Sequence, residues 1–258
     1  MQLSFVKYQG TGNDFILIDG REAIPILDVR FWCDRRFGIG ADGLMILAPS
    51  NEADFEMIYY NSDGQLSSMC GNGGRCIAHW AKFLGIGNGN SLRFKAPDGF
   101  HEATFTPNGI KLSMNPVMDI HLLSNGDTEL NTGSPHYVRQ TTSIPANFVA
   151  QAQAIRQSPS YIKAGINVNF YQVLSPSELR CRTFERGVED ETLSCGTGVT
   201  AVAISYAHAE GLPDGLINVQ TEGGPLRVHF IHDQQEQRYH SIFLEGPATF
   251  VFQGFLNA

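Results

Sequence analysis

The chain has 258 residues, of which 42% are hydrophobic and 10% aromatic, so it is long and apolar enough to fold into two modest domains or one large one. A formal net charge of −8 argues against a nucleic-acid or anionic-membrane binder, because those surfaces select basic proteins. No apolar run approaches the roughly 20 residues that cross a bilayer, and the N-terminus lacks a signal-peptide pattern. Five scattered cysteines fit thiols in a reducing compartment, so we expect a cytoplasmic protein.

The first part of the chain carries strand signals with two helix signals among them. A glycine-rich turn at 9–13 separates the first two strands, and Asp28 is a candidate N-cap for a helix that Gly38 stops. A strand that contains Phe55 and Tyr59 ends at the turn 61–64. The predicted strands are therefore 1–8, 15–19, the stretch around 55–59, 92–96, 101–106 and 109–114, and the predicted helices are 28–37 and 74–84.

The second part of the chain repeats this plan. The segment 115–135 is richer in Asn, Ser, Gly and Pro, so we place the change of domain near 117. A last strand at 249–256 has no counterpart in the first half, and we assign it to the first domain. The predicted domains are 1–117 with 249–258, and 118–248. The second domain is predicted to contain helices near 147–157 and at 199–209, and strands at 166–173, 179–185, 216–221, 225–231 and 240–246.

One motif occurs twice in the chain, at an offset of 125 residues. Cys70 opens a Cys-Gly-Asn-Gly turn and Cys195 opens a Cys-Gly-Thr-Gly turn, and each turn leads into an apolar helix. A helix that is apolar nearly all round is buried and does not lie on a surface. The sequence therefore predicts an α+β fold with two pseudo-symmetric domains, each a curved, mostly antiparallel sheet or barrel wrapped around a central helix.

The repeated motif suggests acid/base chemistry. Glycines leave the amide N–H groups at a helix N-terminus open, and that end binds an anion such as a carboxylate. The same field favours the thiolate of a cysteine placed there. Two facing copies would supply a base, an acid and a carboxylate site. Such a pair suits a reaction that removes a proton from one face of a carbon and returns one to the other.

Other interpretations of the motif stay open at this point. Each cysteine could be a buried, inert residue in a structural turn, although duplication at a fixed offset favours function. A phosphate-binding loop is a second alternative, but neither copy has the P-loop or dinucleotide spacing. Cys70, Cys76 and His79 could be metal ligands, but their side chains would sit on different parts of a buried helix, without the second Cys/His pair that a zinc site needs. We therefore predict no metal.

Seven motifs together resemble the diaminopimelate epimerase family. They follow one another in the family's order over nearly the whole chain. The first of them contains GTGNDF, which separates this family from the proline racemases and phenazine-biosynthesis isomerases that share the duplicated fold. The motifs are KYQGTGNDF at 7–15, GIGADG at 38–43, NSDG at 61–64, MCGNGGRC at 69–76, GSPH at 133–136, ERG at 185–187 and SCGTG at 194–198.

The resemblance implies an isomerase that interconverts LL- and meso-2,6-diaminopimelate without a cofactor, on the route to lysine and peptidoglycan, in a homodimer whose domains close over the substrate. Cys70 and Cys195 match the family's acid/base pair, and Glu185 and His136 match the pair that assists the thiols and binds the reacting ammonium. The predicted contacts of the reacting carboxylate are Gly71, Asn72, Gly196 and Thr197. The predicted contacts of the distal amino-acid end are Asn13, Asn61, Asn167 and Arg186.

Several of these residues also have ordinary structural explanations. Asn13 and Asn61 lie in turns where asparagine is common, and Glu185 with Arg186 could be a surface pair. His136 could be an ordinary loop histidine. The chain departs from the family pattern at two positions: Ser134 stands where many members have Asn, and Gly43 stands where some have Gln.

Two other functions compete with the epimerase. The first is a racemase of the same fold that acts on another amino acid, and the second is a binding protein without catalysis. The distal-end residues speak against the first, because a small substrate has no second zwitterion to bind. Both cysteines speak against the second, because binding alone does not require a thiol on each side.

Overall fold

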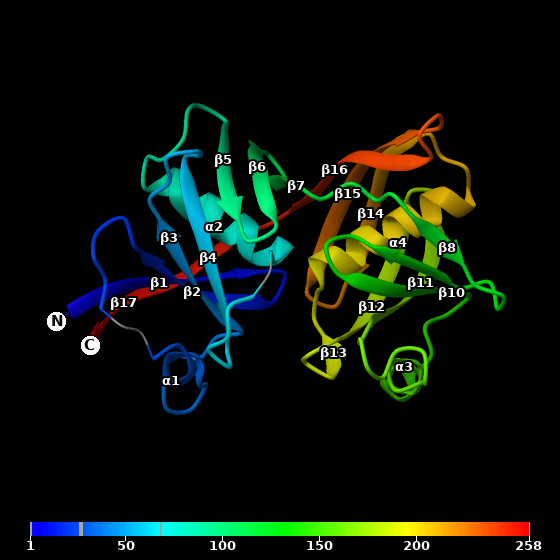
Figure 1. Cartoon of the computed structure of the whole chain (residues 1–258), viewed down its shortest axis with the longest axis horizontal. Coiled ribbons are helices and arrows are strands. Elements are labelled where there is room, and N and C mark those ends of the chain that lie inside the picture. Colours follow the sequence, from blue (N-terminus) through cyan, green and yellow to red (C-terminus); the bar gives the residue numbers. More distant parts are fainter. Residues whose placement is uncertain (1, 26–27, 68, 258) are drawn as a thin grey trace. The chain divides into compact units, whose positions relative to one another are not determined.

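The computed structural model describes residues 2–25, 28–67 and 69–257. The chain divides into two compact units, Met1–Leu112 with Gly246–Ala258, and Ser113–Glu245 (Figure 1). The domain boundaries near 117 and 248 stay a prediction, because compactness alone does not test independent folding.

The strands of the first unit pair in the order β17–β1–β2–β3–β4–β5–β6–β7. The pairs β2–β3 and β4–β5 are parallel, and the other pairs are antiparallel. The last strand of the chain, β17, runs beside the first, β1, over almost its whole length. The bounds are β1 Gln2–Gly10, β2 Asn13–Asp19, β3 Gly43–Ala48, β4 Phe55–Asn61, β5 Ser91–Ala96, β6 Gly99–Thr106, β7 Gly109–Ser113 and β17 Thr249–Asn257.

The second unit repeats this pairing pattern. Its strands pair in the order β8–β9–β10–β11–β12–β14–β15–β16, and β13 pairs with the end of β12. Again two pairs are parallel, β10–β11 and β12–β14, and they lie on either side of the antiparallel pair β11–β12. The bounds are β8 Ile120–Leu122, β9 Thr128–Asn131, β10 Pro135–Thr141, β11 Asn167–Ser175, β12 Glu178–Glu185, β13 Asp190–Thr192, β14 Asp214–Thr221, β15 Gly224–Asp233 and β16 Arg238–Gly246.

Each unit has a central helix, α2 (Gly71–Phe83) in the first and α4 (Gly196–Ala209) in the second. Helix α4 packs against β9, β10, β11, β12, β14 and β15, so its sheet curves around it (Figure 1). Helix α2 packs against β1, β2 and β3 in the same way. Almost every side chain of α4 up to Ala207 is buried, as its apolar sequence predicts. The predicted fold class is confirmed.

The two outer helices differ in how well the sequence predicts them. Helix α3 (Phe148–Arg156) agrees with the prediction of 147–157. Helix α1 is only Val29–Cys33, although 28–37 was expected. The N-cap is correct, since the Asp28 side chain accepts a hydrogen bond from the Phe31 amide at 3.0 Å. The helix ends early because the Asp34 side chain accepts hydrogen bonds from the amides of Arg36 and Phe37, which turns the chain.

Candidate functional site

Cys70 is the residue directly before helix α2, with an extended backbone at φ −117° and ψ 118°. The glycines that follow it form the first turn of the helix, whereas the sequence pattern placed them in a preceding turn. Gly73 has a packing reason: a Cβ there would lie 1.8 Å from the Met45 methyl of β3. Without that Cβ, α2 approaches the sheet closely, and its N-terminus lies directly after Cys70.

The Asn13 amide points toward Cys70. Its Nδ2 donates to Asp42 Oδ2 at 2.6 Å, which fixes the orientation of the amide because a carboxylate only accepts. Its Oδ1 therefore faces the Cys70 Sγ at 3.5 Å and Asn72 Nδ2 at 3.4 Å. We call these three residues, Asn13, Cys70 and Asn72, with Gly71 the Cys70 half-site. The structure brings together all four of the predicted residues in this group.

Asn61 and the departure at Gly43 lie opposite each other on neighbouring strands. Asn61 ends β4 and pairs in register with Gly43 on β3. A Cβ at position 43 would lie 2.5 Å from the Tyr59 ring and 2.6 Å from the Tyr60 carbonyl oxygen. The Tyr59 ring therefore fills the space that a longer side chain at 43 would enter. The Asn61 side chain is half-buried and makes no hydrogen bond to the residues that the structure describes.

Cys195 has the same place in the second unit. It directly precedes α4 and has nearly the backbone of Cys70, with φ −114° and ψ 113°. Its Sγ lies 3.4 Å from Thr197 Oγ1, and Thr132 holds this turn by donating to the Thr197 carbonyl at 2.9 Å. A Cβ at Gly198 would lie 2.5 Å from Asn169 Oδ1, so glycine again lets the helix approach the sheet.

His136 is completely buried in the second unit. Asn169 donates to its Nδ1 at 3.0 Å and to the Tyr137 carbonyl at 3.0 Å, while Asn169 Oδ1 accepts from Thr183 at 2.9 Å. Because Nδ1 accepts, the proton of the neutral ring is on Nε2, which has no partner among the described residues. Burial, reinforced by the charge of Arg186, lowers the His136 pKa to about 3.

The sequence prediction missed the supporting role of Asn169 and Thr183. A signal was present: Asn167 and Asn169 alternate with apolar residues along β11, so both side chains lie on one face of the sheet. Two buried polar groups at alternate strand positions need partners, and His136 is one of them.

Arg186 follows β12 and is exposed, and no carboxylate of the described residues pairs with its guanidinium. Its backbone amide donates to Asn167 Oδ1 at 2.8 Å, and its Nη1 donates to the Ala164 carbonyl at 3.2 Å. Asn167 Nδ2 donates to Ser134 Oγ at 2.8 Å. Ser134, the second departure from the family pattern, is thus tied to Arg186 through Asn167.

Glu185 is the last residue of β12, directly before Arg186. Its carboxylate accepts a hydrogen bond from Thr192 Oγ1 at 3.0 Å. We call His136, Asn167, Glu185, Arg186 and the turn Cys195–Thr197 the Cys195 half-site. The second unit carries every one of the residues that the sequence assigned to it.

Comparison with known proteins decides the family. The family model described as diaminopimelate epimerase matches residues 5–118 and 128–251. A diaminopimelate epimerase of Flavobacterium psychrophilum is 46% identical over 97% of this chain and 99% of its own, and one of Aquifex aeolicus is 37% identical over 99% and 98%. The chain belongs to the diaminopimelate epimerase family. This is a family of isomerases.

Solved structures of other enzyme types share the fold of this family. A phenazine biosynthesis protein of the PhzF family from Bacillus anthracis matches the whole chain with a TM-score of 0.80 at 14% identity. A hydroxyproline epimerase from Agrobacterium vitis, with bound trans-4-hydroxy-L-proline, matches 99% of the chain and 92% of its own with a TM-score of 0.72 at 15% identity. These likenesses show the fold alone. Helices with the length and apolar character to span a bilayer are absent from the described residues.

The other three cysteines differ from the two in the repeated motif. Burial raises the pKa of Cys33 to about 11 and that of Cys76 and of Cys181 to about 12, so all three are neutral thiols near neutral pH. Burial separates Cys70 from these three, because Cys70 is partly exposed, whereas Cys195 is buried as they are.

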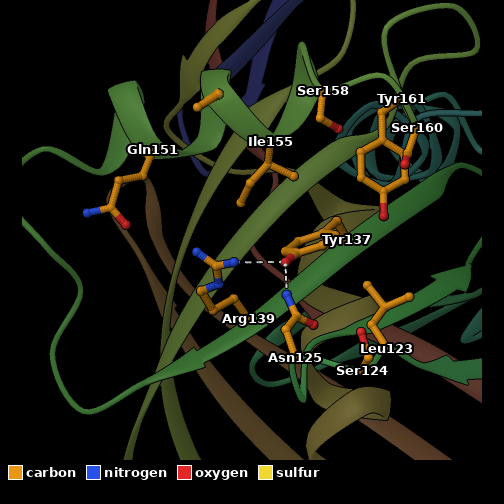
Figure 2. A pocket seen from close by; sticks show the side chains of 11 residues that line it. Leu123, Ser124, Asn125, Tyr137, Arg139, Gln151, Ile155, Ser158, Ser160 and Tyr161 are labelled. Atoms are coloured by element: carbon orange, nitrogen blue, oxygen red, sulfur yellow. Dashed lines mark hydrogen bonds between the residues drawn. The ribbon is translucent and has the colours of Figure 1, made fainter.

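A concave pocket of about 660 Å³ lies elsewhere in the second unit, between β10 and α3 (Figure 2). Its polar groups bond mainly to one another. Arg139 Nη2 donates to the Tyr137 hydroxyl at 2.8 Å and to Asp127 at 2.7 Å, and Asn125 also donates to Tyr137 (Figure 2). None of the family's site residues lines this pocket, and its internally satisfied groups show no preference for a ligand.

Proposed function

We propose that this chain interconverts LL- and meso-2,6-diaminopimelate without a cofactor, with Cys70 and Cys195 as the acid/base pair. One observation carries the proposal: in both units a cysteine directly precedes a buried helix whose first turn contains glycine. Relatives named diaminopimelate epimerase support the choice of substrate.

The proposed reaction needs one thiolate and one thiol. The thiolate takes the proton from the α-carbon and becomes a thiol, and the electron pair of the C–H bond moves into the neighbouring carboxylate. The other thiol then gives its proton to the opposite face of the carbon and becomes a thiolate. Amides of Gly71, Asn72, Gly196 and Thr197 at the helix N-termini stabilise the charge on the carboxylate. A reverse turnover restores the original protonation states.

The supporting residues have proposed roles of two kinds. His136, a neutral ring with an Nε2 proton to donate, and Glu185 assist the thiols, and the Glu185 carboxylate, which accepts hydrogen bonds, binds the reacting ammonium. Arg186 forms no ion pair with a carboxylate of the described residues, and its guanidinium binds the distal carboxylate of the substrate by a bidentate contact. Asn13, Asn61 and Asn167 bind the rest of the distal end. Asn167 also keeps Arg186 in place, because its side-chain oxygen accepts from the Arg186 backbone amide.

We also propose the setting that the family resemblance implies. The protein acts in the cytoplasm as a homodimer, on the route to lysine and peptidoglycan. Residues 1–117 with 249–258 and residues 118–248 form the two domains that close over the substrate.

The test is direct assay of the purified protein. Incubation with LL-diaminopimelate should form the meso isomer, detected by chromatography after derivatisation. Proline, trans-4-hydroxyproline and lysine, which lack the distal amino-acid end or its carboxylate, should react poorly. Equal rates on proline and diaminopimelate would favour the racemase alternative, and tight binding without turnover would favour the binding protein.

A further inference from the structure

Arg75, in the second turn of α2, has a completely buried side chain. Its guanidinium folds back over the first turn and donates to neutral acceptors: the Gly71 carbonyl at 3.2 Å, Asn72 Oδ1 at 3.1 Å, Thr11 Oγ1 at 3.4 Å and the Pro247 carbonyl at 3.3 Å. None of the described carboxylates pairs with it. Burial lowers its pKa to about 10, so it stays charged at neutral pH. A buried cation without an anion is expensive, which indicates that the charge has a use.

The chain holds a strained turn around this guanidinium. Thr11 has φ +50°, an unfavourable conformation for a β-branched residue, and its hydroxyl is one of the acceptors. A Cβ at Gly10 would lie 3.3 Å from Arg75 Nη2 and 3.1 Å from the Asn72 carbonyl oxygen. Residues 10–11 thus adopt the conformation that leaves room for the buried charge.

The other charges near this turn balance one another. Four side chains form one ion-pair cluster beyond Asn13, with nitrogen–oxygen distances of 2.6 to 2.8 Å: Lys7 with Asp14, and Arg35 with both Asp14 and Asp42. Two positive and two negative groups leave no net charge in the cluster.

The titratable groups of α2 and β1 that face the same region are neutral. Burial raises the pKa of Cys76 and of Tyr8 to about 12, and burial lowers the pKa of His79, which contacts the Tyr8 hydroxyl at 3.3 Å. Within the described residues of this region, Arg75 is therefore the charge that no opposite charge balances.

The guanidinium also orients the Cys70 half-site. Because Arg75 donates to Asn72 Oδ1, the Asn72 amide directs its Nδ2 to Asn13 Oδ1. That oxygen also faces the Cys70 Sγ, which favours the protonated thiol. Arg75 and the N-terminus of α2 act in the opposite direction, because a full positive charge and a helix N-terminus both favour an anion.

The second unit has no such charge at the corresponding position. Thr200 stands where the 125-residue repeat places Arg75, and its Oγ1 donates to the Gly196 carbonyl at 2.9 Å. The Gly71 carbonyl, its equivalent, accepts from Arg75 instead. The carbonyl at this position of the first helical turn thus accepts from a cation in the first unit and from a neutral hydroxyl in the second.

We infer that Arg75 is a positioning residue of the Cys70 half-site, whose buried charge stabilises the Cys70 thiolate and makes Cys70 the first of the two thiols to ionise. The inference rests on the proposed function for the role of Cys70 as acid/base group. It extends that proposal by assigning the thiolate of the free protein to the first unit.

The test measures alkylation without substrate. Wild type, Arg75→Gln, Arg75→Lys and, as a matched control, Thr200→Val are treated with iodoacetamide across a pH series, and each cysteine is followed by peptide mass spectrometry. For each cysteine, the midpoint is the pH at which its alkylation rate reaches half of its maximum. In the wild type, the midpoint of Cys70 should be lower than that of Cys195. Arg75→Gln should raise the Cys70 midpoint by about one to two pH units, as expected for removal of a partly screened charge nearby. Arg75→Lys should restore most of that shift, and Thr200→Val should leave the Cys70 midpoint unchanged.

Buried Cys76 reports whether a variant has kept its fold, because it should stay unmodified. An unchanged Cys70 midpoint in a folded Arg75→Gln variant overturns the inference. If that variant unfolds, the wild type decides, since a Cys195 midpoint at or below that of Cys70 also overturns it. Unequal midpoints in a protein that does not turn over diaminopimelate would refute only the proposed function. Equal midpoints in an active epimerase would refute only this inference.

Discussion

The Cys70 and Cys195 half-sites have one backbone plan and different electrostatics. Each cysteine precedes a buried helix and has nearly the same φ and ψ. Around Cys70 the buried polar groups include the charged Arg75, whereas around Cys195 the helix has Thr200 and the sheet contributes the neutral His136. A duplicated fold thus keeps strand order and helix position while its buried polar residues diverge.

The comparison shows which features the two units share and which differ between them. Burying α2 and α4 against a curved sheet requires apolar faces and glycine at the close approaches, so both copies retain them. The charge next to a thiol is not needed for that packing. It is free to differ between the units, and a reaction with one thiolate and one thiol uses unequal partners.

The largest expected effect removes the cysteines one at a time. Cys70→Ala and Cys195→Ala should each lower turnover of diaminopimelate by about 10²–10⁴-fold or more, because general acid/base groups contribute on that scale. Turnover measured with reductant present tests this, and circular dichroism checks the fold. Cys33→Ala, a buried cysteine of the first unit outside the half-site, should keep activity near wild type. A tenth of wild-type turnover in either site variant would contradict a requirement for both units.

The second effect concerns the exposed cation of the second unit. Arg186→Met should raise the KM for diaminopimelate by roughly 30-fold or more, because the bound substrate would bury this charged contact and loss of one partner of such a contact costs about 2–5 kcal/mol. The matched control is Arg180→Met on β12, the strand that Arg186 follows, because the exposed Arg180 side chain is outside the half-site. If both variants bind the substrate equally well, Arg186 does not hold the distal carboxylate.

A smaller effect should follow from moving Arg186 without removing it. Gly165 has φ +76°, and a Cβ there would lie 2.4 Å from Arg186 Cδ. Gly165→Ala should therefore destabilise the fold by roughly 1–3 kcal/mol and also raise KM by about 10-fold, because a misplaced binding group loses part of its contact. Gly211→Ala is the control, with φ +65° and open space around it. Gly211→Ala should lose stability and keep the KM of the wild type. A KM change of equal size in both variants would show that displacement of Arg186 is not the cause.

The last effect concerns stability and not catalysis: the stability of the second unit should depend on pH. Burial lowers the pKa of His136 to about 3, so the folded state holds a neutral ring where the unfolded chain binds a proton below its usual pKa of 6.5. The free energy of unfolding should then fall as the pH drops from 6.5 toward 3, by up to about 1.4 kcal/mol per pH unit from this group. Urea unfolding of wild type and His136→Gln measures it. The variant should lose less stability on acidification, and the difference between the two should be constant above pH 7. Parallel curves at low pH would show that His136 is not buried neutral.

Much of the fold could be predicted because its signals are local. Helix α4 is apolar all round, and β5, β6 and β7 alternate between turn glycines. Strand β3 was missed because its continuous apolar run lacks alternation and follows a loop, and only pairing between β2 and β4 makes it a strand. Strand β9 lies in the segment 115–135 that composition marks as a loop, and its place comes from pairing with β8 and β10.

The sequence predicts the part of the candidate site that lies in the repeated motif. It does not predict the residues whose role depends on their being buried in the fold. The offset of 125 residues points to both cysteines and to the turns that follow them. Arg75 lies in the motif MCGNGGRC, but the sequence predicts no role for it, because arginine is usually exposed and sequence alone does not show a buried one. Its alignment with Thr200, in the middle of an apolar helix, was the available signal.

The central claim is that two thiols act on opposite faces of one carbon, and solvent isotope exchange tests it most directly. LL-diaminopimelate is incubated with the protein in deuterium oxide, and product and remaining substrate are analysed at early times by mass spectrometry. One thiolate removes protium, and the other thiol, already exchanged to S–D, delivers deuterium. The meso product should therefore carry one deuterium at the inverted carbon while the recovered LL isomer stays unlabelled. A meso product that retains its original protium, or LL isomer labelled as fast as the product forms, would contradict the two-thiol account.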